Sequence, residues 1–250
     1  KLESLLLINL KDVSLVAVAT QDVKETVAAI EYSLKGIDFA RVQLFAHYNP
    51  KPESRDYEFI KINNFSSVGE WGKFIIYDLY KFITTKHIVL IHADGFVVNP
   101  ESWDNIFLKY DYIGAPWPLP KDNFSFRDYY GNIIRHGNSV SLRSYKILKL
   151  PSELNLDWDA NAGYFHEDGF LCTVKRHILI KNDIEFAPLD IACKFSHETP
   201  IPEIKGIKPF AFHKWAGENK QYPKFGRYSA SLLDKIITWI KKRGGYGKNN

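Results

Sequence analysis

Short apolar runs alternate with amphipathic segments over the first hundred residues. Residues 14–20 (SLVAVAT) are almost wholly apolar and rich in β-branched side chains, which is typical of a strand buried on both faces of a parallel sheet. The next segment repeats apolar residues every three or four positions, which predicts a helix with Asp22 as a candidate cap and Gly36 at its end. The apolar positions of this helix are Val23, Val27, Ile30 and Leu34. A strand followed by a helix is the first part of a β-α-β unit.

The same alternation continues to residue 99. Residues 41–46 and 57–62 predict two further strands, 72–83 a helix, and 87–92 (HIVLIH) another buried strand. We therefore expect an α/β protein with a mostly parallel central sheet flanked by helices, and a Rossmann-like nucleotide-binding half at its start.

Regular alternation breaks down after Asn99, where loops rich in aromatic residues, proline and glycine begin. The pattern still predicts a helix over 167–181, a short strand over 210–212 and a closing amphipathic helix over 231–242. We expect the loops of this half to build a site.

The composition excludes several classes of protein. The chain has 250 residues, of which 45% are hydrophobic, 15% aromatic and 25% charged, as in one globular domain rather than a disordered or collagen-like chain. The two cysteines, Cys172 and Cys193, are expected to be reduced. A net charge of +4 suits a polyanionic ligand but lacks the dense basic surface of a nucleic-acid-binding protein, so no nucleic-acid partner is expected.

The sequence also bears on location. The early apolar run over 5–10 is too short to span a membrane and lacks the features of a signal peptide, which predicts a soluble, cytoplasmic protein. The basic cluster in the helix at 231–242 predicts, at most, peripheral contact with the inner face of the membrane. Because the chain begins at Lys1 and contains no methionine, we expect it to be part of a longer protein with additional domains.

The strand at 87–92 places His92, Ala93 and Asp94 at its carboxyl end, which is where open α/β sheets bind ligands. Asp94 suits a divalent cation, and such a cation would neutralise a diphosphate. A simple turn after the strand explains Asp94 and Gly95 equally well. A phosphatase of the haloacid-dehalogenase type is disfavoured, because the position of its nucleophilic aspartate holds His92.

Three later segments carry further candidate chemistry. Residues 137–144 (GNSVSLRS) combine a tight turn with small hydroxyl and amide side chains that suit contact with a sugar. Asp168 lies at the start of the helix predicted over 167–181, so it is either a helix cap or a general base. His213 follows an apolar stretch, where a lone histidine is more often structural than a ligand.

The order of these segments resembles the A-type glycosyltransferases, including the β-1,4-galactosyltransferases, in which a metal motif, a glycine loop, an acidic motif with the base and a late metal-binding histidine follow one another. A closer resemblance, to a bacterial and viral family of uncharacterised predicted glycosyltransferases, covers most of the chain. This chain departs from the patterns at His92, where an acid is usual, and at Ser139 and Val140, where glycines are usual. The similar segments are LIHADGF (90–96), YDYIGAPW (110–117), GNSVSLRS (137–144), HEDGF (166–170), ACKFSHE (192–198) and FHKW (212–215).

The resemblance implies an A-type glycosyltransferase fold over a single domain, 1–250. Residues 1–99 would bind the nucleotide sugar, 100–228 would form the acceptor and catalytic half, and 229–250 would form a basic amphipathic helix and tail. The implied activity is transfer of a sugar from a UDP-, GDP- or dTDP-linked donor to a hydroxyl of a glycan or lipid-linked acceptor in polysaccharide biosynthesis. Direct displacement implies inversion at the anomeric carbon, and retention stays open.

The resemblance also assigns roles to residues. Asp168 is the expected catalytic base and Glu167 the next candidate. A Mn²⁺ or Mg²⁺ ion is expected between Asp94 and His213, with His92 as a ligand or a neighbouring hydrogen-bond donor. The residues expected at the donor are Thr20, Gln21, Lys73, His92, Ala93, Asp94, Asn138 and Ser139, and those expected at the acceptor are Trp117, Tyr164 and His166.

Two other functions fit the same fold. A noncatalytic carbohydrate-binding domain would use the loop aromatics Trp117, Trp158 and Tyr164 for stacking. A nucleotidyltransferase would share the metal site but release pyrophosphate instead of transferring a sugar.

Overall fold

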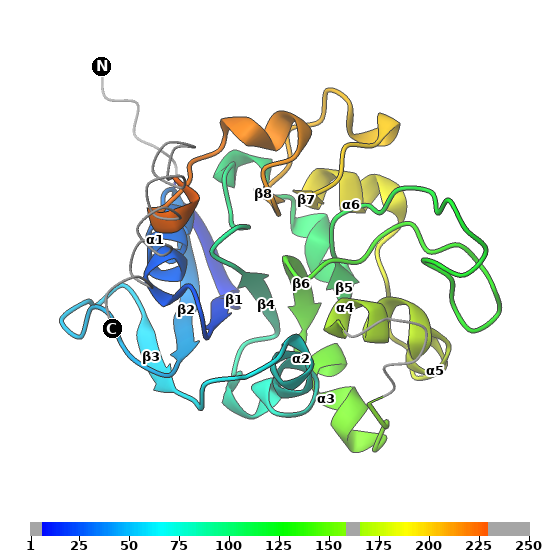
Figure 1. Cartoon of the computed structure of the whole chain (residues 1–250), viewed down its shortest axis with the longest axis horizontal. Helices are drawn as coiled ribbons and strands as arrows, with labels where there is room; N and C mark the ends of the chain where they lie inside the picture. Colours follow the sequence, from blue (N-terminus) through cyan, green and yellow to red (C-terminus); the bar gives the residue numbers. More distant parts are fainter. Residues whose placement is uncertain (1–6, 159–165, 230–250) are drawn as a thin grey trace, which may run out of the picture.

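A six-stranded sheet runs through the centre of the protein (Figure 1). The computed structural model describes residues 7–158 and 166–229. The strands lie in the order β3-β2-β1-β4-β6-β5. Their bounds are β1 (Ile8–Ala19), β2 (Ile37–Ala46), β3 (Glu58–Lys61), β4 (His87–Ile91), β5 (Tyr112–Ile113) and β6 (Ser141–Ser144).

Most neighbouring strands are parallel. β1 lies parallel to β2 and β4, and β2 lies parallel to β3, whereas β6 is antiparallel to both β4 and β5. Helices flank the sheet, and the predicted α/β class with a mostly parallel, Rossmann-like sheet is confirmed. The helices are α1 (Val23–Ser33), α2 (Val68–Tyr77), α3 (Tyr145–Glu153), α4 (Glu167–Gly169), α5 (Arg176–Lys181) and α6 (Leu189–Phe195).

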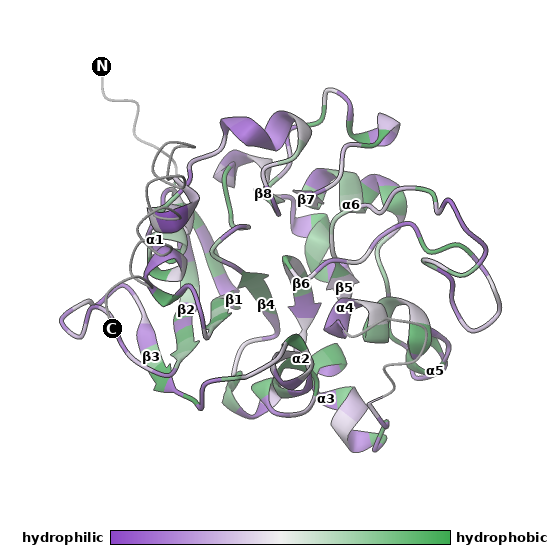
Figure 2. Ribbon diagram, viewed as in Figure 1, coloured by the Kyte–Doolittle hydropathy of each residue, from purple (hydrophilic) through white to green (hydrophobic). Residues whose placement is uncertain are grey.

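Alternate residues of β1 enter two different hydrophobic cores. Leu15 and Ala17 pack in a cluster that includes α1 and α6, while Val16 and Val18 pack in a cluster that includes Ile75 of α2. Because successive side chains of a strand point to opposite faces, both faces of β1 are buried. The apolar character of β1 and β4 is visible in Figure 2.

The second half of the chain adds two smaller units. β7 (Ser196–His197) and β8 (Ala211–Phe212) form a separate two-stranded parallel sheet. A third hydrophobic cluster joins α3 to the segment around α4 and α5 and includes Phe170 and Leu179. The two cysteines are buried and free, as predicted.

The four strands predicted before residue 99 are all present, although β1 begins at Ile8 and β2 at Ile37, earlier than predicted. The helix predicted over 72–83 begins at Val68, because the Ser67 side chain accepts a hydrogen bond from the Glu70 N–H, and it continues as a 3₁₀ turn. β6, α3 and α6 were not predicted.

The continuous helix predicted over 167–181 is wrong. The chain forms α4, then a π-helical turn (Phe170–Val174), and then α5 after a break at Lys175. Asp22 does not cap α1; its carboxylate instead pairs with Arg227 and accepts a hydrogen bond from the Tyr228 hydroxyl at 2.6 Å. The strand predicted at 210–212 is β8, and the helix predicted at 231–242 lies outside the described residues.

Across 7–158 and 166–229, none of the helices combines the length and the apolar character needed to cross a membrane. The cytoplasmic location and the peripheral membrane contact of residues 229–250 stay predictions.

Two glycines bring separate backbone segments into unusually close contact. A Cβ on Gly114 would lie 1.6 Å from the carbonyl oxygen of Gly137, and a Cβ on Gly137 would lie 1.8 Å from the ring of Trp117. The Trp117 ring also stacks on Phe126, with ring centroids 4.9 Å apart. Only glycine fits at these two positions, and the close contact fixes the backbone that leads into Asn138.

Gly137→Ala should therefore lower the free energy of unfolding by roughly 3 kcal/mol, the upper end of the usual cost of overpacking. Denaturant unfolding would measure the loss. Gly69→Ala is the matched control in α2, because its Cβ would meet nothing closer than the Ser67 hydroxyl at 3.8 Å. Equal midpoints for the two variants would contradict the close contact.

Candidate active site

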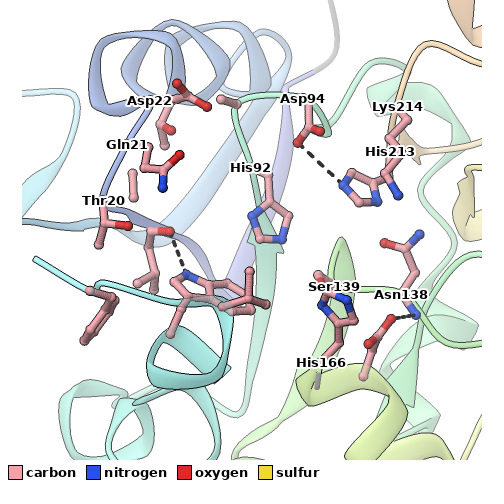
Figure 3. Close-up of a pocket in the computed structure, with 18 of the residues that line it drawn as sticks. Thr20, Gln21, Asp22, His92, Asp94, Asn138, Ser139, His166, His213 and Lys214 are labelled. Atoms are coloured by element: carbon pink, nitrogen blue, oxygen red, sulfur yellow. Dashed lines mark hydrogen bonds and ion pairs between the residues drawn. The ribbon is translucent and has the colours of Figure 1, made fainter. Parts of the chain in front are cut away.

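A pocket of about 590 Å³ lies at the carboxyl ends of β1 and β4. Figure 3 shows Thr20, Gln21 and Asp22 on one side of it, His213 and Lys214 on the other, with His92 and Asp94 between them. The position agrees with the rule that open α/β sheets bind ligands beyond the carboxyl ends of their strands.

The pocket brings together most of the residues that the sequence analysis selected. Residues from β1, β4, the loop before β6, α4 and the segment after β8 all contribute. Those predicted residues are Thr20, Gln21, His92, Ala93, Asp94, Asn138, Ser139, His166, Asp168 and His213. Their roles in binding or catalysis stay predictions.

Two of the residues predicted to contact the donor or the acceptor lie elsewhere, and a third is not described. Lys73 is exposed and lines a separate depression beside β3, because α2 begins four residues earlier than predicted and Lys73 is in its second turn; Trp71 of the same helix lines the pocket. Trp117 is buried against Phe126, with 6% of its surface exposed, and does not line the pocket. Tyr164 lies outside the described residues.

Asp94 and His213 lie together, although 119 residues separate them in the sequence. The Nε2 atom of His213 is 3.5 Å from Oδ1 of Asp94, and its Nδ1 atom is 3.2 Å from Oε1 of Glu198. Glu198 also pairs with Lys214 at 2.6 Å. The His213 ring therefore lies between the carboxylates of Asp94 and Glu198.

The carboxylates and the imidazole shift each other's pKa values. Burial lowers the pKa of His213, but Asp94 and Glu198 outweigh burial and raise it to about 9. Burial raises the pKa of Glu198, but His213 and Lys214 together outweigh burial and lower the value to about 2. His213 similarly outweighs burial at Asp94 and lowers its pKa. Both carboxylates are thus ionised at neutral pH.

His92 lies between two aromatic rings. Its ring centroid is 5.4 Å from that of Trp71 and 5.6 Å from that of His213. Burial lowers its pKa to about 4, so the ring is neutral at physiological pH. Within the described residues the buried Nε2 atom of His92 has no hydrogen-bond partner.

The donor set at Asp94 and His213 suits a divalent cation that is shared with a ligand, on condition that the cation displaces the proton that the raised pKa leaves on His213 at neutral pH. In residues 7–158 and 166–229, no three His, Cys, Asp or Glu side chains are arranged to hold a metal by themselves. The 3.5 Å spacing suits two neighbouring ligands with metal bonds of roughly 2.0–2.6 Å. Mg²⁺ sites commonly use one or two carboxylates and complete their coordination with substrate phosphates and water. Glu198 lies beside Nδ1 of His213, the ring nitrogen that does not face Asp94. In metal sites, carboxylates in this position orient the histidine ligand.

Asp168 faces the same pocket from α4. Its two carboxylate oxygens accept hydrogen bonds from the backbone N–H groups of Asn138, at 3.1 Å, and Gly169, at 2.8 Å. Burial and the neighbouring negative charge of Glu167 raise the pKa of Asp168 to about 6. A partly exposed carboxylate with a pKa near neutrality suits a general base.

Glu167, the second catalytic candidate, points away from the pocket. It is fully buried and pairs with Arg143 of β6 at 2.7 Å, and the Arg143 Nε also donates to the hydroxyl of Ser141 at 2.9 Å. Burial raises the pKa of Glu167, but the charge and the hydrogen bond of Arg143, together with His92, outweigh burial and keep the pKa below its usual value. Glu167 is fully buried and does not line the pocket, so Asp168 is the better placed of the two candidates, and the catalytic role of either stays a prediction.

Sequence reasoning missed several residues that line the pocket. Glu198 and Lys214 both belong to segments that carried the family resemblance, so their motifs were the available signal. Trp71 and Tyr228 gave no comparable signal, because their approach to the pocket depends on where α2 begins and on the contact of Tyr228 with Asp22.

Residues 55–213 match a family described as "Protein of unknown function (DUF5672)". The chain belongs to this family. No curated protein matches the sequence. The matched region contains β3 to β8 and reaches from the edge of the sheet to His213, so it holds both Asp94 and Asp168.

Solved structures with a similar fold include the glycosyltransferase GlyE of Streptococcus pneumoniae TIGR4, at 11% identity and a TM-score of 0.46, and its apo form, at 10% and 0.41. The alignments cover 92% of this chain and 63% of those chains. The bifunctional IspDF of Campylobacter jejuni aligns at 13% identity with a TM-score of 0.39, over 62% of this chain and 46% of that one. This chain thus spans about half to two thirds of the length of these proteins.

Arg143→Met should cost about 3–5 kcal/mol of the free energy of unfolding at neutral pH, because it leaves the Glu167 charge buried without its partner. Arg143→Met combined with Glu167→Leu should regain most of that loss. Arg41→Met breaks the exposed pair between Arg41 and Glu58 and should cost less than about 1 kcal/mol. Denaturant unfolding would check all three, and a loss for Arg143→Met as small as for Arg41→Met would contradict the buried-charge account.

Proposed function

We propose that this protein is a metal-dependent glycosyltransferase that transfers a sugar from a nucleotide-sugar donor to a hydroxyl of a glycan or lipid-linked acceptor. The observation that carries the proposal is the pairing of two different sites across one pocket. One is the Asp94–His213 pair, which suits a cation, and the other is Asp168, a separate carboxylate of raised pKa.

The donor would lie along the pocket from β1 toward the loop before β6. Thr20 and Gln21 would contact the nucleoside, beside an apolar wall that includes Trp71, whose indole N–H is already bonded to the Val18 carbonyl at 3.0 Å. The sugar would lie near Ser139, between the cation-binding pair and Asp168. This order places the diphosphate beside Asp94.

The leaving nucleoside diphosphate needs positive charge. A bound Mn²⁺ or Mg²⁺ ion would supply Lewis-acid stabilisation of that leaving group. Asp94 and His213 would hold the ion, with Glu198 orienting the His213 ring. Lys214 brings a further cation to the pocket, because 60% of its side chain is exposed there while its ammonium group pairs with Glu198.

Asp168 would take the proton from the acceptor hydroxyl as that oxygen attacks the anomeric carbon. The backbone N–H groups of Asn138 and Gly169 hold its carboxylate in one orientation. Attack by the acceptor from the side opposite the diphosphate inverts the anomeric carbon. With a pKa of about 6, Asp168 is still mostly ionised at neutral pH, and it is a stronger base than an ordinary aspartate.

The noncatalytic carbohydrate-binding alternative has less support. Trp117 is buried, and the half-buried Trp158 stacks on Phe170 with ring centroids 5.3 Å apart, so two of the three aromatics proposed for sugar stacking already pack against other protein rings. A nucleotidyltransferase would use the same cation-binding pair, and product analysis separates it, because it releases pyrophosphate from a nucleoside triphosphate.

A panel of nucleotide sugars should raise the melting temperature only for the correct donor and only with Mn²⁺ or Mg²⁺ present. Asp94→Asn should abolish the metal-dependent part of that shift, because the amide is a poor ligand for a hard cation. Asp190→Asn, an exposed position outside the pocket, is the control and should behave as the wild type. Stabilisation that persists in a chelator would rule out the metal, and stabilisation by nucleoside triphosphates alone would favour the nucleotidyltransferase.

Asp168→Asn should lower kcat by roughly 100-fold or more while donor affinity stays within a few fold, since general-base assistance typically contributes 10²–10⁴. In the wild type, activity should fall as the pH drops through about 6, because protonated Asp168 cannot accept the acceptor proton. Steady-state rates between pH 5 and 8 would show this limb. Normal turnover in Asp168→Asn would exclude Asp168 as the base.

A further inference from the structure

Asn138 contacts the two halves of the candidate site at once. Its backbone N–H donates to Oδ2 of Asp168 at 3.1 Å, and its side-chain Nδ2 donates to Oε2 of Glu198 at 2.8 Å. Figure 3 shows Asn138 beside Ser139 and below His213. Asp168 belongs to α4, and Glu198 directly follows β7. The distance between the two carboxylates is therefore set by tertiary contacts and not by the local sequence.

Asn138 is itself held rigidly. The Tyr112 hydroxyl donates to its carbonyl oxygen at 2.5 Å, and the Val140 N–H donates to its side-chain Oδ1 at 2.9 Å. Its backbone φ is 93°, a left-handed conformation that few residues other than glycine adopt, and only 2% of its surface is exposed. Every polar atom of Asn138 thus has a protein partner, and it cannot turn toward a ligand without losing one.

The contact with Glu198 sets the orientation of that carboxylate. Asn138 engages Oε2, which leaves Oε1 facing His213 Nδ1 at 3.2 Å and Lys214 Nζ at 2.6 Å. If the Asn138 amide did not hold Oε2, the Glu198 carboxylate could rotate, and the orientation of the His213 ring would no longer be fixed. One amide N–H group therefore acts on His213 through Glu198.

We propose that Asn138 is a positioning residue that holds Asp168 with its main chain and Glu198 with its side chain. It thereby keeps the base on the acceptor side in a fixed position relative to His213 on the cation side. The inference rests on the proposed function for the roles of Asp168 and His213. The contacts made by Asn138 do not depend on those roles.

Asn138→Asp is the single substitution that tests the hydrogen bond from Asn138 to Glu198 most directly. It keeps the size of the side chain, tolerance of the left-handed backbone and the oxygen that accepts from Val140, but it puts a carboxylate oxygen where the amide donated to Glu198. The affinity for Mn²⁺ alone, measured by electron paramagnetic resonance of the free ion, should fall roughly 10–100-fold. Losses of this size are typical when a residue that orients a metal ligand is changed. The unfolding midpoint should fall as well.

Combining Asn138→Asp with Glu198→Gln reverses the direction of the hydrogen bond. The new amide donates to the new carboxylate, and the oxygen that remains at position 198 still faces Nδ1 of His213 and accepts from Lys214. The double variant should regain most of the lost unfolding midpoint and of the Mn²⁺ affinity. A residue that only filled space would show no such recovery.

Asn155→Asp is the matched control. Asn155 is exposed after α3, has a φ of 49° and does not line the pocket, so the same substitution there should leave both the unfolding midpoint and the Mn²⁺ affinity unchanged.

Two results would overturn the inference: wild-type Mn²⁺ affinity in folded Asn138→Asp, or no recovery of the unfolding midpoint in the double variant. A wild-type protein that binds no Mn²⁺ would instead overturn the metal dependence of the proposed function. In that case the unfolding midpoints, or the yield of folded protein if Asn138→Asp alone does not fold, still decide whether Asn138 holds Glu198.

Discussion

The buried ion pair between Arg143 and Glu167 determines how the candidate site is arranged. It joins β6 to α4 in the interior, where neither side chain is exposed. Because Glu167 is held inward, the next residue, Asp168, faces the pocket. The pKa of Asp168 is raised first by burial and then by the buried negative charge of Glu167 beside it. The ion pair therefore fixes the direction of the proposed base and contributes to its proton affinity.

From Asp168 a chain of polar contacts crosses the pocket. It runs through Asn138 and Glu198 to His213 and ends at Asp94. These residues come from β4, α4, the loop before β6 and the segments that follow β7 and β8, so the site depends on tertiary structure more than on any single motif. Such networks impose their geometry when each member has its partners.

The sequence predicted those elements in which the apolar residues form a regular pattern. β1 and β4 were recognised because both faces are apolar, whereas β6 was missed because Ser141 and Arg143 are polar yet fully buried. The proximity of Asp94 and His213 followed from the strand-end rule and the family resemblance, and the structure confirms it. The sequence shows that Glu167 and Asp168 are neighbours but does not show which of the two is buried. Glu167 is the buried one because it pairs with Arg143.

Two other residues lie elsewhere than predicted for equally local reasons. Lys73 was expected at the donor because the helix was taken to begin at Gly72; with a start at Val68, Lys73 lies in the second turn instead of at the N-terminus of the helix. Trp117 has the composition of a sugar-stacking residue, but the missing side chain of Gly137 leaves room for its ring inside the protein. Neither helix register nor burial of an aromatic ring can be read from spacing alone.

The contact between Asp22 and Tyr228 has a consequence for how the protein matures on the ribosome. Both residues line the pocket, yet 206 positions separate them along the chain. The β-α-β half can assemble early from local contacts, but its pocket lacks one wall until residue 228 has been synthesised and has returned to the start of α1. A nascent chain therefore acquires its sheet well before it can enclose a ligand.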